Sequence, residues 1–206
     1  MSLTDAQIYE LGKRLKVPIA DVCFKDELPD TLEYNKCYFI NLQDSVDQDG
    51  QVAPGTHWTM VEVFKRPNGK VEPIYFDSYG VAPPEYVKTV VKNTTGKAGL
   101  PYATKDIQSL LNNACGYYCL AFAHFINSSV FRSGELYRDV EMFVSLFDDL
   151  NKSTDFKKNE YILKMFFRSS DPDKRTPIDV EKISEDNEPG GIDAFRLPVE
   201  VKTIKK

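Results

Sequence analysis

The sequence predicts one α+β domain over residues 1–168, from two features of the chain. Strand patterns cluster before a central segment, residues 115–127, and helical patterns follow that segment, which is the order expected of an α+β fold. The central segment is apolar nearly all round, as a helix buried in the middle of a domain would be. We therefore expect a central mixed or antiparallel sheet that packs on a buried central helix, with other helices at its flanks.

The first elements follow from local patterns. A helix is expected over residues 4–15, where Thr4 can cap the N-terminus and apolar residues recur at three- and four-residue steps. A strand is expected over residues 36–42. The polar stretch that follows, residues 43–55, contains Gly and Pro and is expected to be a loop.

A β-hairpin is expected next, because strand patterns at residues 57–64 and 71–76 flank the turn signal Pro67-Asn68-Gly69. Helices are expected at residues 84–92, 115–127, 135–148 and 155–168. From Ser169 onward the chain is rich in Pro, Asp, Glu, Lys and Gly, so we expect an extended or partly disordered tail over residues 169–206.

The composition narrows the classes of function. Hydrophobic residues make up 42% and charged residues 28% of the chain, and no apolar run approaches the roughly 20 residues that span a bilayer. The N-terminal stretch has no signal-peptide core, so we expect an intracellular protein that does not associate with a membrane.

The charge and the cysteines narrow the possible ligands. The net charge is −5 and no dense basic run occurs, which gives nucleic-acid binding no support. Four cysteines and two histidines at these spacings do not predict a zinc site.

His57 and Asp77 are the first candidates for chemistry. His57 opens a strand directly after a Pro-Gly-Thr loop, so it should lie at a strand end, where a histidine is more often structural than catalytic. Asp77 ends the second strand of the hairpin, which brings it to the same open end, where a carboxylate can orient the imidazole ring. Taken alone, Asp77 could equally cap the turn Ser78-Tyr79-Gly80.

Cys115 heads the apolar central segment. A thiol at a helix N-terminus lies beside unpaired N–H groups and the positive end of the helix dipole, which stabilise a thiolate. Gly116 lets the backbone and a substrate approach closely. The side-chain amide of Gln108 could form an oxyanion hole with the backbone N–H of Cys115. The plainer alternative, a buried core thiol, is favoured for Cys23, Cys37 and Cys119.

These residues together form a pattern more specific than any one of them. The segments GTHWTMVEVFKRPNGKVEPIYFDSYG and NNACGYYCLAFAHFI resemble the active-site segments of the adenovirus protease (adenain) family, whose relatives occur in virophages and Maverick/polinton elements. The pattern is more distantly similar to that of the ubiquitin-like-protein proteases. The resemblance covers residues 3–150 and implies an adenain-like fold and a cysteine endopeptidase.

The resemblance implies a role for four residues. Cys115 matches the nucleophile, His57 its base and Gln108 the glutamine of the oxyanion hole. Asp77 matches the acidic third member, which is Glu in the adenoviral branch and Asp in the ubiquitin-like branch. The order His–Asp–Cys along the chain excludes the papain order, in which Cys comes first.

Four further residues match positions near the implied site. Trp58, which follows the base, matches a tryptophan that walls the substrate cleft, and Gly116 is expected to contact the substrate beside it. His124 matches a helix histidine that is not catalytic, and Cys119 matches a position with no catalytic role.

The resemblance also bears on cofactors, substrates and location. Adenoviral members use a disulfide-tethered viral peptide and DNA as cofactors. This chain has no cysteine between Lys92 and Leu100, where the tethering cysteine would fall, and its composition is acidic. The sequence therefore requires neither a covalently tethered peptide nor a DNA cofactor, and no metal, and the family analogy leaves a peptide or DNA activator open as an alternative. The implied substrates are viral capsid and core precursors, cut during particle maturation where Gly or another small residue adjoins the scissile bond. We expect a monomer in the infected cell and in the virion.

Three alternatives stay open at this point. The tail segment Pro189-Gly190-Gly191-Ile192 resembles a cleavage site next to small residues, so the protein could cut its own tail there or hold the segment near the cleft. A flexible linker turn is the plainer explanation. The protein could instead process ubiquitin or a ubiquitin-like modifier, which would need a broad surface for a folded modifier. A catalytically silent binding module is the third alternative, and the intact His, Asp, Gln and Cys set argues against it.

Overall fold

The computed structural model describes residues 3–128, 133–152 and 156–170. Within these residues the chain is an α+β fold with a four-stranded mixed sheet and five α-helices, which confirms the predicted class. Residues 171–206, and with them most of the predicted tail and its Pro-Gly-Gly segment, lie outside the described residues.

The sheet has the strand order β1-β2-β3-β4. The strands are β1 (Ile19–Phe24), β2 (Cys37–Asn41), β3 (Trp58–Lys65) and β4 (Val71–Phe76). β1 runs parallel to β2, and the other two pairs are antiparallel. The hairpin between β3 and β4 turns where it was predicted to, since the N–H of Gly69 donates to the carbonyl of Arg66 at 2.9 Å.

Strand β1 was not predicted from the sequence. Its residues IADVCF are mostly half-buried, and the register shifts between Ile19 and Asp21. An edge strand that packs only partly does not need the clean alternation of apolar and polar residues that marks a half-buried strand. Its parallel pairing with β2 is what makes the sheet mixed.

All five helices were predicted, with small differences at their ends. They are α1 (Asp5–Arg14), α2 (Glu85–Thr95), α3 (Cys115–Asn127), α4 (Leu136–Ser145) and α5 (Phe156–Ser170). The predicted cap on α1 is present as a capping box, in which Thr4 and Gln7 exchange hydrogen bonds. α4 ends three residues earlier than predicted, and α5 continues two residues into the predicted tail.

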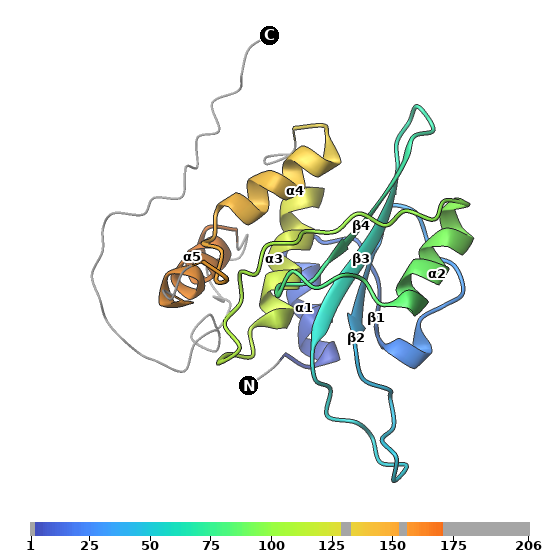
Figure 1. Ribbon diagram of the computed structural model, residues 1–206, viewed down its shortest axis with the longest axis horizontal. Coiled ribbons are helices and arrows are strands. Elements are labelled where there is room, and N and C mark those ends of the chain that lie inside the picture. The colour runs from blue at the N-terminus through green and yellow to red at the C-terminus, as the bar shows by residue number, and fades with distance from the viewer. Residues whose placement is uncertain (1–2, 129–132, 153–155, 171–206) are drawn as a thin grey trace.

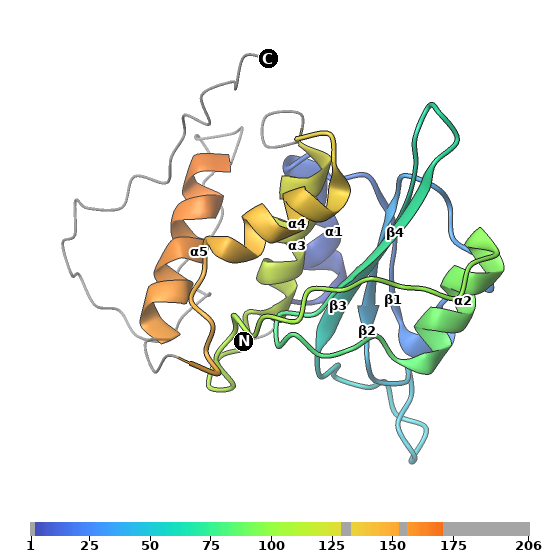
Figure 2. The same ribbon diagram turned by 45° about the horizontal axis from the view of Figure 1, so that its top comes forward.

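Helices cover both faces of the sheet. α2 lies on one face, and α1 and α3 pack on the other with α4 and α5 beyond them (Figures 1 and 2). Side chains at alternate strand positions therefore enter different cores. Phe39, Met60 and Phe76 face α3, and Tyr38, Val61 and Tyr75 face α2. No helix among the described residues is both long and apolar enough to cross a bilayer.

Helix α3 is held at the centre of the larger core. Phe122 stacks on Phe76 of β4 with ring centroids 4.2 Å apart, and Phe143 of α4 meets both rings edge-on. At its C-terminal end, the amide of Asn127 donates to the buried carboxylate of Glu62 on β3 at 2.8 Å. These contacts fix α3 against the sheet along its length, and so fix the position of its first residue.

A buried asparagine of α5 holds the loop before α3. The Nδ2 group of Asn159 donates to the carbonyls of Ile107 and Asp148 at 3.0 and 2.8 Å, and its Oδ1 accepts from the N–H of Asp148 at 2.7 Å. Only 1% of Asn159 is exposed. Because Ile107 adjoins Gln108, this asparagine helps to fix the loop that carries that glutamine.

We expect Asn159→Ala to lower the free energy of unfolding by about 2–4 kcal/mol, because it removes three hydrogen bonds and leaves backbone groups near the core without a partner. Denaturant unfolding measures this change. Asn93→Ala is the control, since Asn93 is exposed and makes one hydrogen bond, to the carbonyl of Asp30, and its effect should stay within about 1 kcal/mol. Equal effects of the two substitutions would contradict the role given to Asn159.

Candidate active site

The open end of the β3–β4 hairpin brings His57 and Asp77 together. His57 directly precedes β3 and Asp77 directly follows β4. In the pairing, Met60 lies opposite Phe76, so the two strands end side by side. The Nε2 atom of His57 lies 3.0 Å from Oδ1 of Asp77, whose side chain is 2% exposed. The same oxygen accepts the backbone N–H of Tyr79 at 2.8 Å.

Cys115 reaches this pair from the other side of the core. It is the first residue of α3 and is 3% exposed. Its side chain is hydrogen-bonded with the His57 ring. Because Nε2 of His57 contacts Asp77, the hydrogen bond with the Cys115 sulfur is made by the other ring nitrogen, Nδ1. The structure thus brings together the thiol, the imidazole and the carboxylate that the sequence singled out.

The environment of His57 favours its protonated form. Burial of the ring lowers its pKa, and the hydrogen bonds with Asp77 and Cys115 outweigh that effect, so the pKa rises from 6.5 to about 9. The ring therefore holds its proton through neutral pH and loses it as the pH rises through about 9. A protonated imidazole beside a sulfur atom is the partner that a thiolate nucleophile requires.

Gln108 lies beside the site in a buried network. Its Oε1 accepts from the Ser78 hydroxyl at 2.6 Å, and its Nε2 donates to the Tyr79 hydroxyl at 3.2 Å and to the carbonyl of Asn112 at 3.1 Å. Its backbone N–H donates to the carbonyl of Ser78 at 3.2 Å. Gln108 is therefore fastened to the turn that follows Asp77.

Gly80 allows that turn to close. Its φ of +69° lies in the left-handed region that favours glycine. A Cβ at this position would also lie 2.5 Å from the carbonyl oxygen of Thr104. The turn after Asp77 therefore requires glycine for its backbone conformation and for its close contact with the 104–105 segment.

Tyr79 is a site residue that the sequence analysis treated only as part of a turn. Its ring stacks on His57, with centroids 4.7 Å apart and an interplanar angle of 25°. Burial, followed by the charges of Cys115 and Asp77, raises the pKa of Tyr79 to about 12. The sequence feature that could have identified Tyr79 was its position two residues after Asp77, in a turn that folds back toward His57.

The two residues expected to contact the substrate are buried. Trp58 is 3% exposed, and its indole N–H donates to the carbonyl of Leu3 at 2.8 Å. A Cβ on Gly116 would meet the Leu3 side chain at 3.2 Å and Ile8 at 3.4 Å. In this structure both residues hold the N-terminal segment beside the head of α3, and their contact with a substrate stays a prediction.

The other histidine and cysteines lie outside the site. Nδ1 of His124 is 3.0 Å from the carbonyl oxygen of Leu15, and burial lowers the pKa of this histidine. The thiol of Cys119 donates to the carbonyl of Trp58 at 3.2 Å, and burial raises its pKa well above the usual value. Burial raises the pKa of both remaining thiols in the same direction, those of Cys23 and Cys37.

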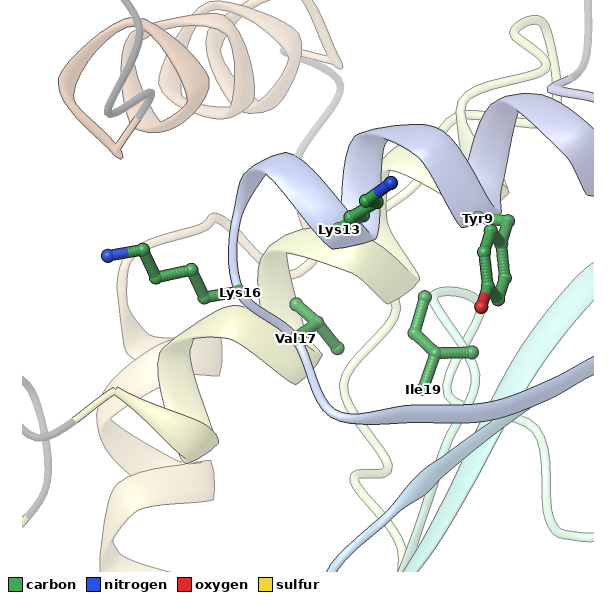
Figure 3. A pocket seen from close by; sticks show the side chains of 5 residues that line it. All are labelled: Tyr9, Lys13, Lys16, Val17 and Ile19. Atoms are coloured by element: carbon green, nitrogen blue, oxygen red, sulfur yellow. The ribbon is translucent and has the colours of Figure 1, made fainter.

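A cluster of metal ligands or a pocket would be another mark of a functional site. In the part of the chain that the structure describes, no group of three or more His, Cys, Asp or Glu side chains could hold a metal ion. A pocket of about 230 Å³ lies between α1 and β1 (Figure 3). It contains none of the residues of the site described above, and its lining residues are Tyr9, Lys13, Lys16, Val17 and Ile19.

The fold and the site together define a Cys–His–Asp triad. Its thiol is at the N-terminus of a buried helix, its imidazole is hydrogen-bonded to the thiol, and its buried carboxylate contacts the imidazole. No protein-family model matches the sequence, and no curated protein matches it either.

We expect the two histidines to titrate on opposite sides of pH 6.5. NMR of the imidazole protons should give His57 a pKa near 9 and His124 a pKa below 6.5, for the reasons given above. Asp77→Asn should lower the pKa of His57, because it removes the negative charge behind the ring, and should leave His124 unchanged. A pKa of His57 at or below 6.5 in the unaltered protein would contradict the described site.

Proposed function

We propose that this protein is a cysteine endopeptidase of the adenain kind, with Cys115 as nucleophile, His57 as base and Asp77 as the residue that orients the base. One observation carries the proposal: the His57 ring is hydrogen-bonded on one side with Cys115 and on the other with Asp77. The nucleophile, base and orienting group therefore lie in contact in the order that acyl transfer requires.

The proposed reaction has two stages. The Cys115 sulfur attacks a peptide carbonyl carbon, and the carbonyl oxygen becomes an oxyanion that the backbone N–H of Cys115 and the Gln108 network stabilise. The C–N bond then breaks as protonated His57 gives its proton to the leaving amine. In the second stage His57 takes a proton from water, the hydroxide attacks the thioester carbon, and the C–S bond breaks.

Asp77 and the turn around it support the geometry of this reaction. The carboxylate fixes His57 with Nδ1 directed to the sulfur, and its second hydrogen bond, from Tyr79, fixes the carboxylate itself. A base oriented in this way needs no reorganisation when the proton moves. The position of Cys115 at the first turn of α3 adds the partial positive charge of the helix N-terminus.

The proposed substrates are viral capsid and core precursors, cut during particle maturation next to Gly or another small residue. This part of the proposal rests on the sequence resemblance to adenain, which also supports an adenain-like fold and a location in the infected cell and the virion. We propose a monomer that requires no peptide, DNA or metal cofactor. Peptide cleavage assays with and without DNA test the cofactor part directly.

One observation favours a second candidate, a protease for ubiquitin or a ubiquitin-like modifier. The third member of the site is Asp77, and the resemblance associates Asp with the ubiquitin-like branch and Glu with the adenoviral one. A fluorogenic modifier substrate separates the two candidates. Rapid release of the fluorophore from a folded modifier, with slow cleavage of short Gly-containing peptides, would favour this second candidate.

We expect Cys115→Ala to lower the rate of peptide cleavage by at least about 10⁴-fold, because it removes the nucleophile. The matched control is Cys119→Ala, one turn further along α3, whose thiol is buried and donates to the carbonyl of Trp58; this variant should keep its cleavage rate within a few-fold. Equal cleavage by the unaltered protein and by Cys115→Ala would end the proposal.

We also expect iodoacetamide to alkylate Cys115 faster than the other three thiols. All four thiols are buried, but burial raises the pKa values of Cys23, Cys37 and Cys119, whereas Cys115 has a protonated imidazole beside it. Peptide mass mapping after brief alkylation identifies the modified residue. A uniform, slow reaction at all four cysteines would favour the catalytically silent binding module.

A further inference from the structure

The hydrogen bonds of Gln108 leave its amide group fully engaged. A primary amide has two N–H hydrogens, and here they go to the carbonyl of Asn112 and to the hydroxyl of Tyr79. The orientation of the amide follows from its surroundings, because a backbone carbonyl can only accept and must therefore face Nε2. The remaining oxygen, Oε1, accepts from Ser78.

Direct donation from Gln108 to an oxyanion would therefore break one of these hydrogen bonds. Asn112 is 9% exposed, so its carbonyl would stay buried without the hydrogen bond from Gln108. Leaving a buried acceptor unsatisfied costs the desolvation of that group, which would offset much of what a new hydrogen bond to the substrate contributes. The amide of Gln108 is consequently better placed to orient a neighbour than to meet the substrate.

The hydroxyl of Tyr79 is that neighbour, and its own proton is available. It accepts a hydrogen from Gln108, and among the described residues it has no acceptor for the hydrogen it carries. Tyr79 is half-buried, unlike Gln108, and its ring stacks on His57, which is hydrogen-bonded with Cys115. Its raised pKa keeps the hydroxyl protonated over the pH range in which His57 holds its proton.

We propose that the Tyr79 hydroxyl is the side-chain donor to the oxyanion formed at Cys115, and that Gln108 is a positioning residue that orients this hydroxyl. The inference rests on the proposed protease function and changes the role of Gln108 within it. Tyr79 is then a catalytic residue that donates with its hydroxyl, packs on the base with its ring, and holds Asp77 with its backbone N–H.

Tyr79→Phe tests the donor, because it removes only the hydroxyl and keeps the ring on His57. We expect kcat for peptide cleavage to fall about 10²-fold with KM changed less than about threefold, as when one oxyanion-hole donor is removed. The affinity for a peptide aldehyde, which forms a tetrahedral adduct with the thiol, should fall by a similar factor. The rate of alkylation by iodoacetamide should stay within about twofold, since alkylation forms no oxyanion.

The control is Tyr86→Phe, which removes the hydroxyl of another half-buried tyrosine, on α2 across the sheet. Its kcat, aldehyde affinity and alkylation rate should equal those of the unaltered protein. If Tyr79→Phe likewise keeps kcat and aldehyde affinity within twofold, the inference is overturned.

A double-mutant cycle tests the positioning role of Gln108. Gln108→Met keeps a similar volume and removes the amide, and it should lower kcat in the unaltered protein. In the Tyr79→Phe background it should have less than about a threefold further effect, because no hydroxyl remains to be oriented. Full, independent losses in both backgrounds would mean that Gln108 donates directly, and would overturn the inference. Thermal unfolding of each variant shows that it is folded.

Failure of the inference and failure of the proposed function give different results. If the unaltered protein cleaves no peptide faster than Cys115→Ala and binds no peptide aldehyde, the protease proposal fails and the inference fails with it. If the unaltered protein is active and Tyr79→Phe is equally active, only the inference fails.

Discussion

The packing of α3 against the sheet is the constraint on which the site depends. Phe122 on Phe76 and Asn127 on Glu62 hold the helix at its middle and at its C-terminal end. A helix fixed at two points has no freedom to slide, so its first residue, Cys115, lies where the hairpin opens. The catalytic proposal therefore rests on core packing some distance from the sulfur, and not on the local loop alone.

Asp77 has the corresponding role on the sheet side. Its Oδ1 accepts from the His57 ring and from the backbone N–H of Tyr79, so one buried carboxylate fixes both the base and the turn that follows. The turn then folds back because Gly80 adopts a left-handed conformation. As a result, the ring of Tyr79 lies on His57 and its hydroxyl reaches Gln108. A single charged group thereby organises residues that come from a strand end, a turn and the loop before α3.

Most of the fold followed from local patterns, and the exceptions have physical reasons. The buried helix at residues 115–127 was predicted to the residue because it is apolar all round and ends in polar residues. The hairpin was predicted because its turn residues are distinctive. β1 was missed because an edge strand packs too little to impose a pattern. His57, Asp77 and Cys115 were singled out from residue type and order. The contact between His57 and Asp77 was inferred from the hairpin geometry, and the pairing of Cys115 with His57 followed only from the family resemblance. The role of Asn159 in holding the loop before α3 could not be predicted from the sequence, because it depends on tertiary contacts between α5 and that distant loop.

Gln108 shows most clearly where residue type stops being informative. The family resemblance gives the glutamine seven residues before the thiol the role of an oxyanion-hole amide, and that role assumes that an N–H of the amide is not already engaged. In the structure the carbonyl of Asn112 and the hydroxyl of Tyr79 occupy both of its hydrogens. The side chain of Asn112 donates to Glu160 of α5 and accepts from the N–H of Ala114, and its backbone N–H donates to the carbonyl of Ser109, so the residue that carries this carbonyl is held on both sides. When the hydrogens of a buried amide are all engaged, only a group of the same network that keeps an unused proton can donate to a substrate. In this network that group is the hydroxyl of Tyr79.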